Sequence, residues 1–171
     1  MKKILYSAFL AAAVLFTACD KDEIENTNMV DLAGQWYVTC EAVDENGEVL
    51  YTDDELYGMG HFYVFTYNTA ADKDEIYVDD QGQFWEFKVR AKADVATKTF
   101  AVEDGQNEYY DCGVTIEDGK ILFGAATTPH GTPADSISFY VAFDDDDYIA
   151  AGLWAKYHIS GFRYTGLAQD D

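Results

Sequence analysis

The sequence is short of basic residues and prolines, and each shortage narrows what the protein can do. Lysine and arginine number 11 against 32 aspartates and glutamates, which gives a formal net charge of −21. This charge repels a phosphate backbone, so nucleic acid is excluded as a partner, and it disfavours direct contact with anionic lipid headgroups. Only 2 prolines accompany 13 tyrosines and 11 phenylalanines, a composition that favours β-strands.

The sequence also lacks an apolar run long enough to cross a bilayer as a helix. Residues 4–16 are apolar, but the run is shorter than the ~20 residues that a spanning helix needs. Lys2 and Lys3 precede the run, and Thr17-Ala18-Cys19 follows it. A basic start, a short apolar segment and small residues at the cleavage site together predict a secretory signal peptide at residues 1–18.

Cys19 directly follows small residues, so the segment resembles the lipobox of bacterial lipoproteins. The resemblance implies cleavage after residue 18 and acyl chains on the sulfur and the amine of Cys19. Several acyl chains form a stable membrane anchor, because each buried CH₂ contributes ~0.8 kcal/mol. An ordinary secretory peptide with an incidental cysteine is the alternative interpretation.

Residues 19–30 are predicted to form an acidic tether between this anchor and a single domain at residues 31–171. The charged run at residues 20–25 resembles the short acidic signals that direct some lipoproteins to the cell exterior. The same run also fits a solvated linker. We therefore expect an outer membrane lipoprotein, with its domain either exposed on the cell surface or held at the inner leaflet.

Few residues suggest redox or metal chemistry. Cys40 and Cys112 permit one disulfide in an oxidising compartment, and two buried thiols fit the sequence equally well. Neither H-E-x-x-H nor Cys-x-x-Cys is present, and the acidic residues 144–147 lack the spacing of an EF-hand. We expect no metal site and no cofactor, and we interpret the acidic run as a hairpin corner that keeps the protein soluble.

Polar and apolar residues alternate from Asp31 onward, with turn signals every ~8–12 residues. This spacing is typical of an antiparallel barrel or sandwich of about eight to ten short strands. The expected strands are residues 34–43, 48–52, 61–68, 76–78, 84–91, 98–102, 114–117, 120–126, 135–143 and 156–165. Residues 53–59 are predicted to form a loop or a short helix, and residues 148–155 a short helix or a bulged strand.

Four dipeptides mark the predicted turns between these strands. Each contains a glycine, which adopts the positive φ that a tight hairpin requires. The four are Asn46-Gly47, Gln81-Gly82, Asp104-Gly105 and Asp118-Gly119. We expect the last of them to join residues 114–117 and 120–126 as a hairpin.

The first strand opens with Gly34-Gln35-Trp36, which resembles the entry motif of lipocalins. Lipocalins are eight-stranded barrels that bind small apolar ligands. The resemblance implies that Trp36 lies at the closed end of the barrel and that an arginine near the end of the chain packs across its ring. Arg163 stands on the last expected strand and fits this role, because a guanidinium over an indole forms a favourable cation–π pair.

A second resemblance covers residues 30–168. It rests on the lipobox, the Gly34-Gln35-Trp36 entry, the ending at residues 159–166 and the distinctive stretch Pro133-Ala134-Asp135-Ser136-Ile137. Together these features are similar to the lipid-binding putative hydrolase family of small bacterial lipoproteins. The resemblance implies an all-β fold, an antiparallel lipocalin-like β-barrel of about eight strands.

Hydrolysis is one of three functional hypotheses. A hydrolase acting on a lipid or ester needs a nucleophile with a base in reach, and Ser136 with His130 is the candidate pair. Asp135 and Ser136 are neighbours on a strand and point to opposite faces, so they form no local dyad. No G-x-S-x-G motif is present. The hypothesis therefore requires Ser136 to lie close to His61, His130 or His158.

The leading hypothesis is a barrel that binds a small apolar or amphipathic ligand without catalysis. Such a pocket is lined mainly by apolar side chains, with a few polar groups that orient the ligand. Six residues are expected to point inward as its lining: Phe62, Val64, Trp85, Phe87, Phe139 and Val141. The same six would equally form a filled core with no pocket.

The third hypothesis is a subunit that binds a protein partner in an outer membrane complex. Tyrosine is enriched at protein interfaces because its ring is apolar and its hydroxyl is polar. Tyr37, Tyr109 and Tyr110 are the candidate contact residues.

Overall fold

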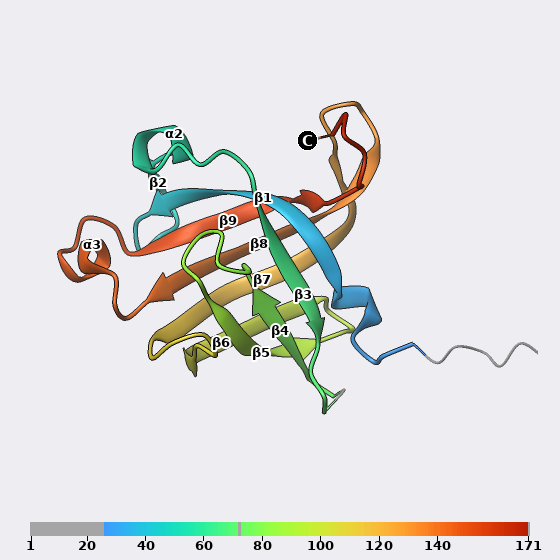
Figure 1. Ribbon diagram of the computed structural model, residues 1–171, viewed down its shortest axis with the longest axis horizontal. Coiled ribbons are helices and arrows are strands. Elements are labelled where there is room, and N and C mark those ends of the chain that lie inside the picture. The colour runs from blue at the N-terminus through green and yellow to red at the C-terminus, as the bar shows by residue number, and fades with distance from the viewer. Residues whose placement is uncertain (1–25, 72, 171) are drawn as a thin grey trace, which may run out of the picture.

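The computed structural model describes residues 26–71 and 73–170 and contains a closed, antiparallel β-barrel. The strands are hydrogen-bonded in the order β2-β1-β3-β4-β5-β6-β7-β8-β9, and β1 also pairs with β9 (Figure 1). Eight strands form the closed barrel, and the short β2 pairs antiparallel with the last residues of β1. The predicted fold class, an antiparallel barrel of about eight strands, is confirmed.

The strands are β1 (Gly34–Val43), β2 (Val49–Tyr51), β3 (Phe62–Asn68), β4 (Glu75–Asp79), β5 (Lys88–Asp94), β6 (Thr99–Gln106), β7 (Gly113–Thr127), β8 (Pro133–Phe143) and β9 (Lys156–Arg163). Three short helical segments join them: η1 (Val30–Leu32), α2 (Asp53–Leu56) and α3 (Asp147–Ala150). Residues 148–155 thus begin with a short helix. No helix of residues 26–71 and 73–170 has the length and apolar character needed to cross a membrane.

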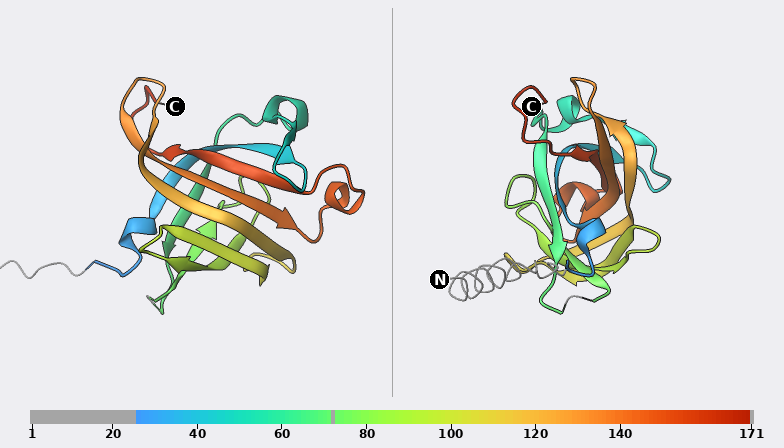
Figure 2. Two further views of the ribbon diagram at one scale, coloured as in Figure 1. Left: turned by 180° about the vertical axis from the view of Figure 1, so that it is seen from behind. Right: turned by 90° about the vertical axis from the view of Figure 1, so that its right-hand side faces the viewer.

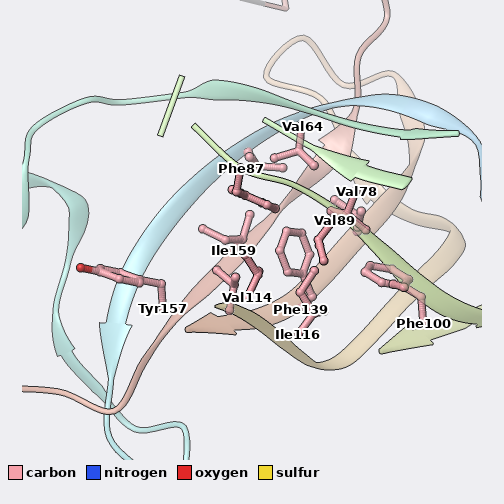
Figure 3. Close-up of a cluster of buried hydrophobic side chains, with 14 of the residues drawn as sticks. Val64, Val78, Phe87, Val89, Phe100, Val114, Ile116, Phe139, Tyr157 and Ile159 are labelled. Carbon is pink, nitrogen blue, oxygen red and sulfur yellow. The ribbon is translucent and has the colours of Figure 1, made fainter. Parts of the chain in front are cut away.

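The alternation of each strand determines which side chains fill the interior. In β1, Trp36, Val38 and Cys40 are fully buried, and the residues between them are only half-buried. Successive strand residues point to opposite faces, so the buried set lines the inside of the barrel. Figure 3 shows buried apolar side chains of the other strands, with Val89, Phe139 and Ile159 close together.

The two ends of the barrel differ. At one end, here called the closed end, η1 precedes β1, and the β7–β8 hairpin and the C-terminal segment extend beyond the barrel on the same side (Figure 1). At the other end, here called the aromatic end, α2, α3 and the loop at residues 80–87 gather (Figures 1 and 2). The candidate ligand site lies at the aromatic end.

Two predicted hairpin turns are in fact irregularities within strands. Asp118-Gly119 lies inside β7, where Asp118 has φ 51° and the pairing register with β8 shifts between Glu117 and Lys120. A β-bulge therefore bends one long strand, and the expected hairpin between residues 114–117 and 120–126 is wrong. Asp104-Gly105 likewise lies within β6, at a register shift against β7. Gly and Asp adopt positive φ in bulges as readily as in turns, so the dipeptide alone does not distinguish them.

Candidate functional site

The closed end is organised around Trp36. Its ring is fully buried, its indole N–H donates to Thr66 Oγ1 at 2.8 Å, and the Arg163 guanidinium lies 4.4 Å from the ring centroid. Arg163 also donates to the carbonyl of Ala33 at 2.8 Å and to the Asp135 carboxylate at 3.0 Å. A cation held over an indole by two hydrogen bonds stabilises the closed end of the barrel.

The space around Gly34 explains the Gly-x-Trp spacing. A Cβ atom at Gly34 would overlap Arg163 Nη1 and would lie 3.0 Å from the Trp36 ring. Glycine therefore lets the arginine pack flat between the strand entry and the indole. The sequence motif and the distant arginine form one packing unit.

Five of the six predicted ligand-lining residues lie inside the barrel and are packed against one another. Phe62 is 4 % exposed, Val141 is 1 % exposed, and the remaining three are fully buried: Val64, Phe87 and Phe139. They belong to one continuous apolar cluster. These five residues are therefore part of the apolar core, and their role as a ligand lining stays a prediction.

Trp85, the sixth residue, lies elsewhere. Residues 84–91 were expected to form one strand, but β5 begins only at Lys88, and Glu86 has φ 53°. Trp85 instead belongs to the loop at residues 80–87 and is half-buried at the aromatic end. The alternation of this segment therefore predicted a strand where a structured loop is present.

One buried carboxylate determines the shape of this loop. Asp80 is fully buried, and its two oxygens accept five backbone N–H groups at 2.7 to 3.0 Å. The donors are Gly82, Phe84, Trp85, Glu86 and Phe87. Hydrogen bonds to an ionised carboxylate are about twice as strong as neutral ones, so Asp80 fixes the path of the loop backbone.

The loop places two aromatic rings across the aromatic end. The Phe84 ring lies 5.3 Å from that of Phe62 and 5.1 Å from that of Tyr157, and the Trp85 ring stacks on Phe143 at 4.9 Å. Offset and edge-on aromatic pairs of this kind each contribute about 0.5–1.5 kcal/mol beyond burial. Phe84 and Trp85 thus form a plug, supplied by a loop, above a floor of strand residues.

Polar groups surround this plug. The Tyr157 hydroxyl, fully buried, donates to Asp146 at 2.7 Å and lies 2.9 Å from the Tyr57 hydroxyl. Burial, followed by these two hydrogen bonds, raises the pKa of Tyr157 far above its usual value. Asp146 also accepts the backbone N–H of Tyr148 and so caps α3. This network ties α2 and α3 to the end of the barrel.

Asp145 holds the outer edge of the plug. It accepts the Trp85 indole N–H at 3.1 Å, the Tyr110 hydroxyl at 2.9 Å and the Cys112 thiol at 3.2 Å. Partial burial acts against ionisation, but these three donors lower the pKa of Asp145. Asp144 accepts the backbone N–H of Gly113. Ligand atoms of Cys112, Asp144 and Asp145 lie within 4.8 Å of one another, and each carboxylate accepts at least one internal hydrogen bond.

The sequence allowed either a Cys40–Cys112 disulfide or two buried thiols. The structure has the second arrangement, with both cysteines as free thiols. Cys40 is buried beside Asp53, with Sγ 3.8 Å from its carboxylate, and Cys112 is buried beside Asp145. Burial, and then the neighbouring carboxylate, raises the pKa of each thiol to about 12. Neither thiol is a nucleophile at neutral pH, because the thiolate is the reactive form.

Large apolar side chains are exposed around the same end. Tyr148 is 49 % exposed and Leu153 is 50 % exposed. The others come from β2 and from the segment around α2: Val49, Leu50, Tyr51, Tyr57 and Met59. These seven residues are here called the apolar rim. Exposed apolar side chains that gather on one part of a protein surface mark sites that contact ligands, membranes or proteins.

The tyrosines proposed as partner contacts are tied into the fold. The Tyr109 and Tyr110 hydroxyls donate to Asp79 and Asp145, and Tyr37 is half-buried and stacks on His61 at 4.4 Å between ring centroids. Tyr109 remains 45 % exposed. The partner hypothesis stays a prediction.

The structure gives Ser136 and His130, the predicted catalytic pair, different partners. Ser136 pairs with Phe162 in the β8–β9 ladder, and within the described chain it makes no hydrogen bond to any histidine. The β8 residue that pairs with His158 is Tyr140. Tyr140 stands four residues from Ser136, which is about 14 Å along the strand. His130 Nδ1 instead lies 3.8 Å from Asp170.

A different serine does meet a histidine. Ser138 Oγ lies 2.9 Å from His158 Nε2, and His158 Nδ1 lies 3.4 Å from Glu41 Oε2. Sequence reasoning missed this group because its members come from β8, β9 and β1. Their proximity depends on the closure of the barrel, which pairs Glu41 with His158 directly.

The fold and this end define a class: small, closed, eight-stranded antiparallel barrels with an aromatic plug at one end. The family model of lipid-binding putative hydrolases matches residues 21–168. The chain belongs to this family. A comparison with curated proteins found no match.

Proposed function

We propose that the protein is an outer membrane lipoprotein whose barrel binds a small amphipathic ligand at the aromatic end, without catalysis there. The anchor rests on the lipobox-like segment ending at Cys19, which lies outside the described residues. The acidic run at residues 20–25 lies outside them too, and surface exposure rests on it alone. The lipid-binding family and the barrel support ligand binding.

One observation carries the location of the binding site. The plug residues Phe84 and Trp85 come from a loop, whereas the floor beneath them comes from strands. The two side chains can rotate without breaking the barrel ladder or the hydrogen bonds to Asp80, so a ligand chain can replace the two rings above Phe62 and Phe143. The apolar rim comes from the segments of β2, α2 and α3 at this same end, and it suits the transfer of an acyl chain from a membrane.

The charge of the entrance favours a neutral or cationic headgroup. Asp79, Asp80, Asp145 and Asp146 all lie at this end. The cations of the neighbouring β5 strand, Lys88 and Arg90, are already paired with Glu108. A fatty acid carboxylate would therefore meet like charge, which costs binding free energy. A monoacylglycerol meets no such repulsion.

Fluorescence of the three tryptophans tests this proposal. The full-length chain, purified with its anchor and exchanged into an amphipathic polymer, is titrated with brominated monoolein and with brominated oleate. The Trp154 ring stacks on Tyr148 of the apolar rim, 4.9 Å between centroids. Bromine quenches only at short range, so we expect monoolein to quench Trp85 and Trp154 at the aromatic end and to spare Trp36. Leu153→Asp on the apolar rim should weaken quenching, and Phe123→Asp, an exposed aromatic position on β7 outside the rim, should not.

Equal quenching by both lipids would contradict the headgroup preference. No quenching by either lipid, together with no lipid extracted from the purified protein, would overturn the binding site itself.

A further inference from the structure

We propose that Ser138, His158 and Glu41 form a catalytic site on the outer wall of the barrel that hydrolyses small carboxylic esters. Ser138 Oγ lies 2.9 Å from His158 Nε2, and His158 Nδ1 lies 3.4 Å from Glu41 Oε2. Serine on one ring nitrogen and a carboxylate on the other is the arrangement of the serine hydrolase triad, which recurs on unrelated folds.

The strand register holds the three side chains in a row. Glu41 and His158 are direct partners in the β1–β9 ladder, and Ser138 stands two residues from Tyr140, the partner of His158 on β8. The residues beside them in sequence, Cys40, Phe139 and Ile159, point into the core and are fully buried. The triad therefore projects from the outer face, on rigid strands and not on loops.

The serine is accessible on the side away from the histidine. It lines an open hollow of about 740 Å³ over β5, β6, β7 and β8, whereas His158 and Glu41 lie on the opposite side, over β9 and β1. The hollow is also lined by Phe100, Ala101, Lys92, Lys120 and Asp118. A substrate seated in the hollow would meet Ser138 Oγ while His158 remains behind it as the base.

Lys120 is positioned to stabilise the developing negative charge. It is the direct partner of Ser138 in the β7–β8 ladder, and it forms no ion pair within the described part of the chain. Partners on one face of a sheet have Cβ atoms about 4.5–5.5 Å apart, so the flexible lysine stem can bring its ammonium to a carbonyl oxygen bound at Ser138. A positive group at the oxyanion lowers the barrier to acyl transfer.

The reaction balances with water as the second substrate. Ser138 Oγ attacks the ester carbonyl carbon while its proton passes to His158 Nε2, and the oxyanion forms beside Lys120. The C–O bond to the alcohol then breaks, and the proton on His158 Nε2 reaches the leaving oxygen through a water molecule. Water attacks the acyl-serine, giving one proton to His158 and releasing the acid as Ser138 regains its proton. Glu41 accepts the Nδ1–H bond throughout and acts as a positioning residue.

The hollow favours short acyl groups. It is open to solvent, and the barrel interior beneath it is occupied by buried side chains such as Phe139. A long acyl chain would therefore remain in water. We expect hydrolysis of p-nitrophenyl butyrate and none of p-nitrophenyl palmitate.

The test uses the full-length chain in detergent, a fluorophosphonate that labels activated serines, and p-nitrophenyl butyrate. Mass spectrometry should place the label on Ser138. Ser138→Ala and His158→Gln should each lower kcat/KM at least ~1000-fold. Glu41→Gln should lower kcat at least ~100-fold with KM unchanged, because only the orientation of the base is lost. Ser160→Ala, at the β9 partner of Ser138, is the matched control and should retain turnover.

Two results would overturn the proposal. One is a wild-type protein that neither hydrolyses the butyrate nor takes up the fluorophosphonate. The other is turnover that persists in Ser138→Ala. Because all of these side chains face outward, the substitutions should leave the thermal unfolding midpoint close to that of wild type. This measurement checks that the variants are folded. The site lies on the wall, away from the aromatic end, so ligand binding and hydrolysis can fail independently.

Discussion

The Arg163 guanidinium lies 4.4 Å above the Trp36 ring, although 127 residues separate the two in the chain. The contact joins the first barrel strand to the last beside their ladder pairing, where Trp36 and Arg163 are also direct register partners. Backbone hydrogen bonds and a side-chain stack therefore both join β1 to β9 and close the barrel at this end.

Arg163→Met tests the side-chain contribution. Methionine keeps an apolar stem over the indole but loses the cation and leaves Asp135 and the Ala33 carbonyl without their donor. We expect the free energy of unfolding to fall by about 1–3 kcal/mol in urea denaturation. Arg90→Met is the control, because Arg90 is 59 % exposed and its ion pair with Glu108 contributes at most about 1 kcal/mol. Equal losses in both variants would contradict a special role for Arg163.

Much of the barrel could be predicted from the sequence, because alternation fixes which face of a strand is buried. The inward set of β1, from Trp36 to Ala42, follows from this rule alone. The loop at residues 80–87 could not be predicted in this way. Its aromatic residues alternate like a strand, and only the burial of Asp80 among five N–H donors shows that the backbone turns there. The alternation of polar and apolar residues does not show which backbone N–H groups a buried aspartate will accept.

The wall site illustrates a second limit. Ser138 and Ser136 have the same outward direction on β8, so periodicity cannot choose between them. The choice depends on register with β9, which places His158 opposite Tyr140, and the register depends on barrel closure. A pattern in one strand does not encode its alignment with another.

Asp80→Asn should loosen the plug. Asparagine keeps one acceptor oxygen but replaces the other with an N–H₂ group that faces backbone donors. We expect the free energy of unfolding to fall by about 2–4 kcal/mol, because a charged acceptor and several hydrogen bonds are lost together. Freed from its position, Trp85 should emit at longer wavelength and be quenched by acrylamide.

Asp44→Asn provides the matched control for this change. Asp44 also accepts backbone N–H groups, those of Asn46 and Glu48, but in an exposed turn. Asp44→Asn should lower the free energy of unfolding by less than Asp80→Asn does, and it should leave Trp85 emission unchanged. An Asp80→Asn variant with unshifted emission would contradict the claim that this carboxylate holds the plug.

Alkaline pH should destabilise the protein because the pKa values of several tyrosines are raised in the folded state. Burial, followed by a hydrogen bond to Asp79, raises the pKa of Tyr109 to about 12, and the pKa values of Tyr157 and Tyr110 rise for similar reasons. The unfolded chain releases these protons near pH 10 and the folded chain only later. Stability from these groups is therefore full below about pH 10 and is lost as pH rises above it.

Urea midpoints between pH 7 and pH 11.5 measure this dependence. Tyr110→Phe removes one tyrosine with a raised pKa, so the decline of the midpoint above pH 10 should be shallower in the variant than in wild type. A flat profile from pH 9 to pH 11.5 would show that the folded and unfolded states titrate alike.

Cys40 and Cys112 should resist alkylation in the folded protein. With a pKa of about 12, the thiolate fraction at pH 8 is ~10⁻⁴, about a thousandfold below that of a thiol with the ordinary pKa of 9.0. Burial of both sulfurs slows the reaction further. Mass spectrometry after iodoacetamide at pH 8 should show both thiols unmodified over hours in buffer, and both alkylated within minutes in 8 M urea, the concentration chosen as the unfolding control. Rapid labelling of Cys112 without urea would mean that the Tyr110–Asp145 edge of the plug opens often, and an oxidised pair would contradict their separate carboxylate partners.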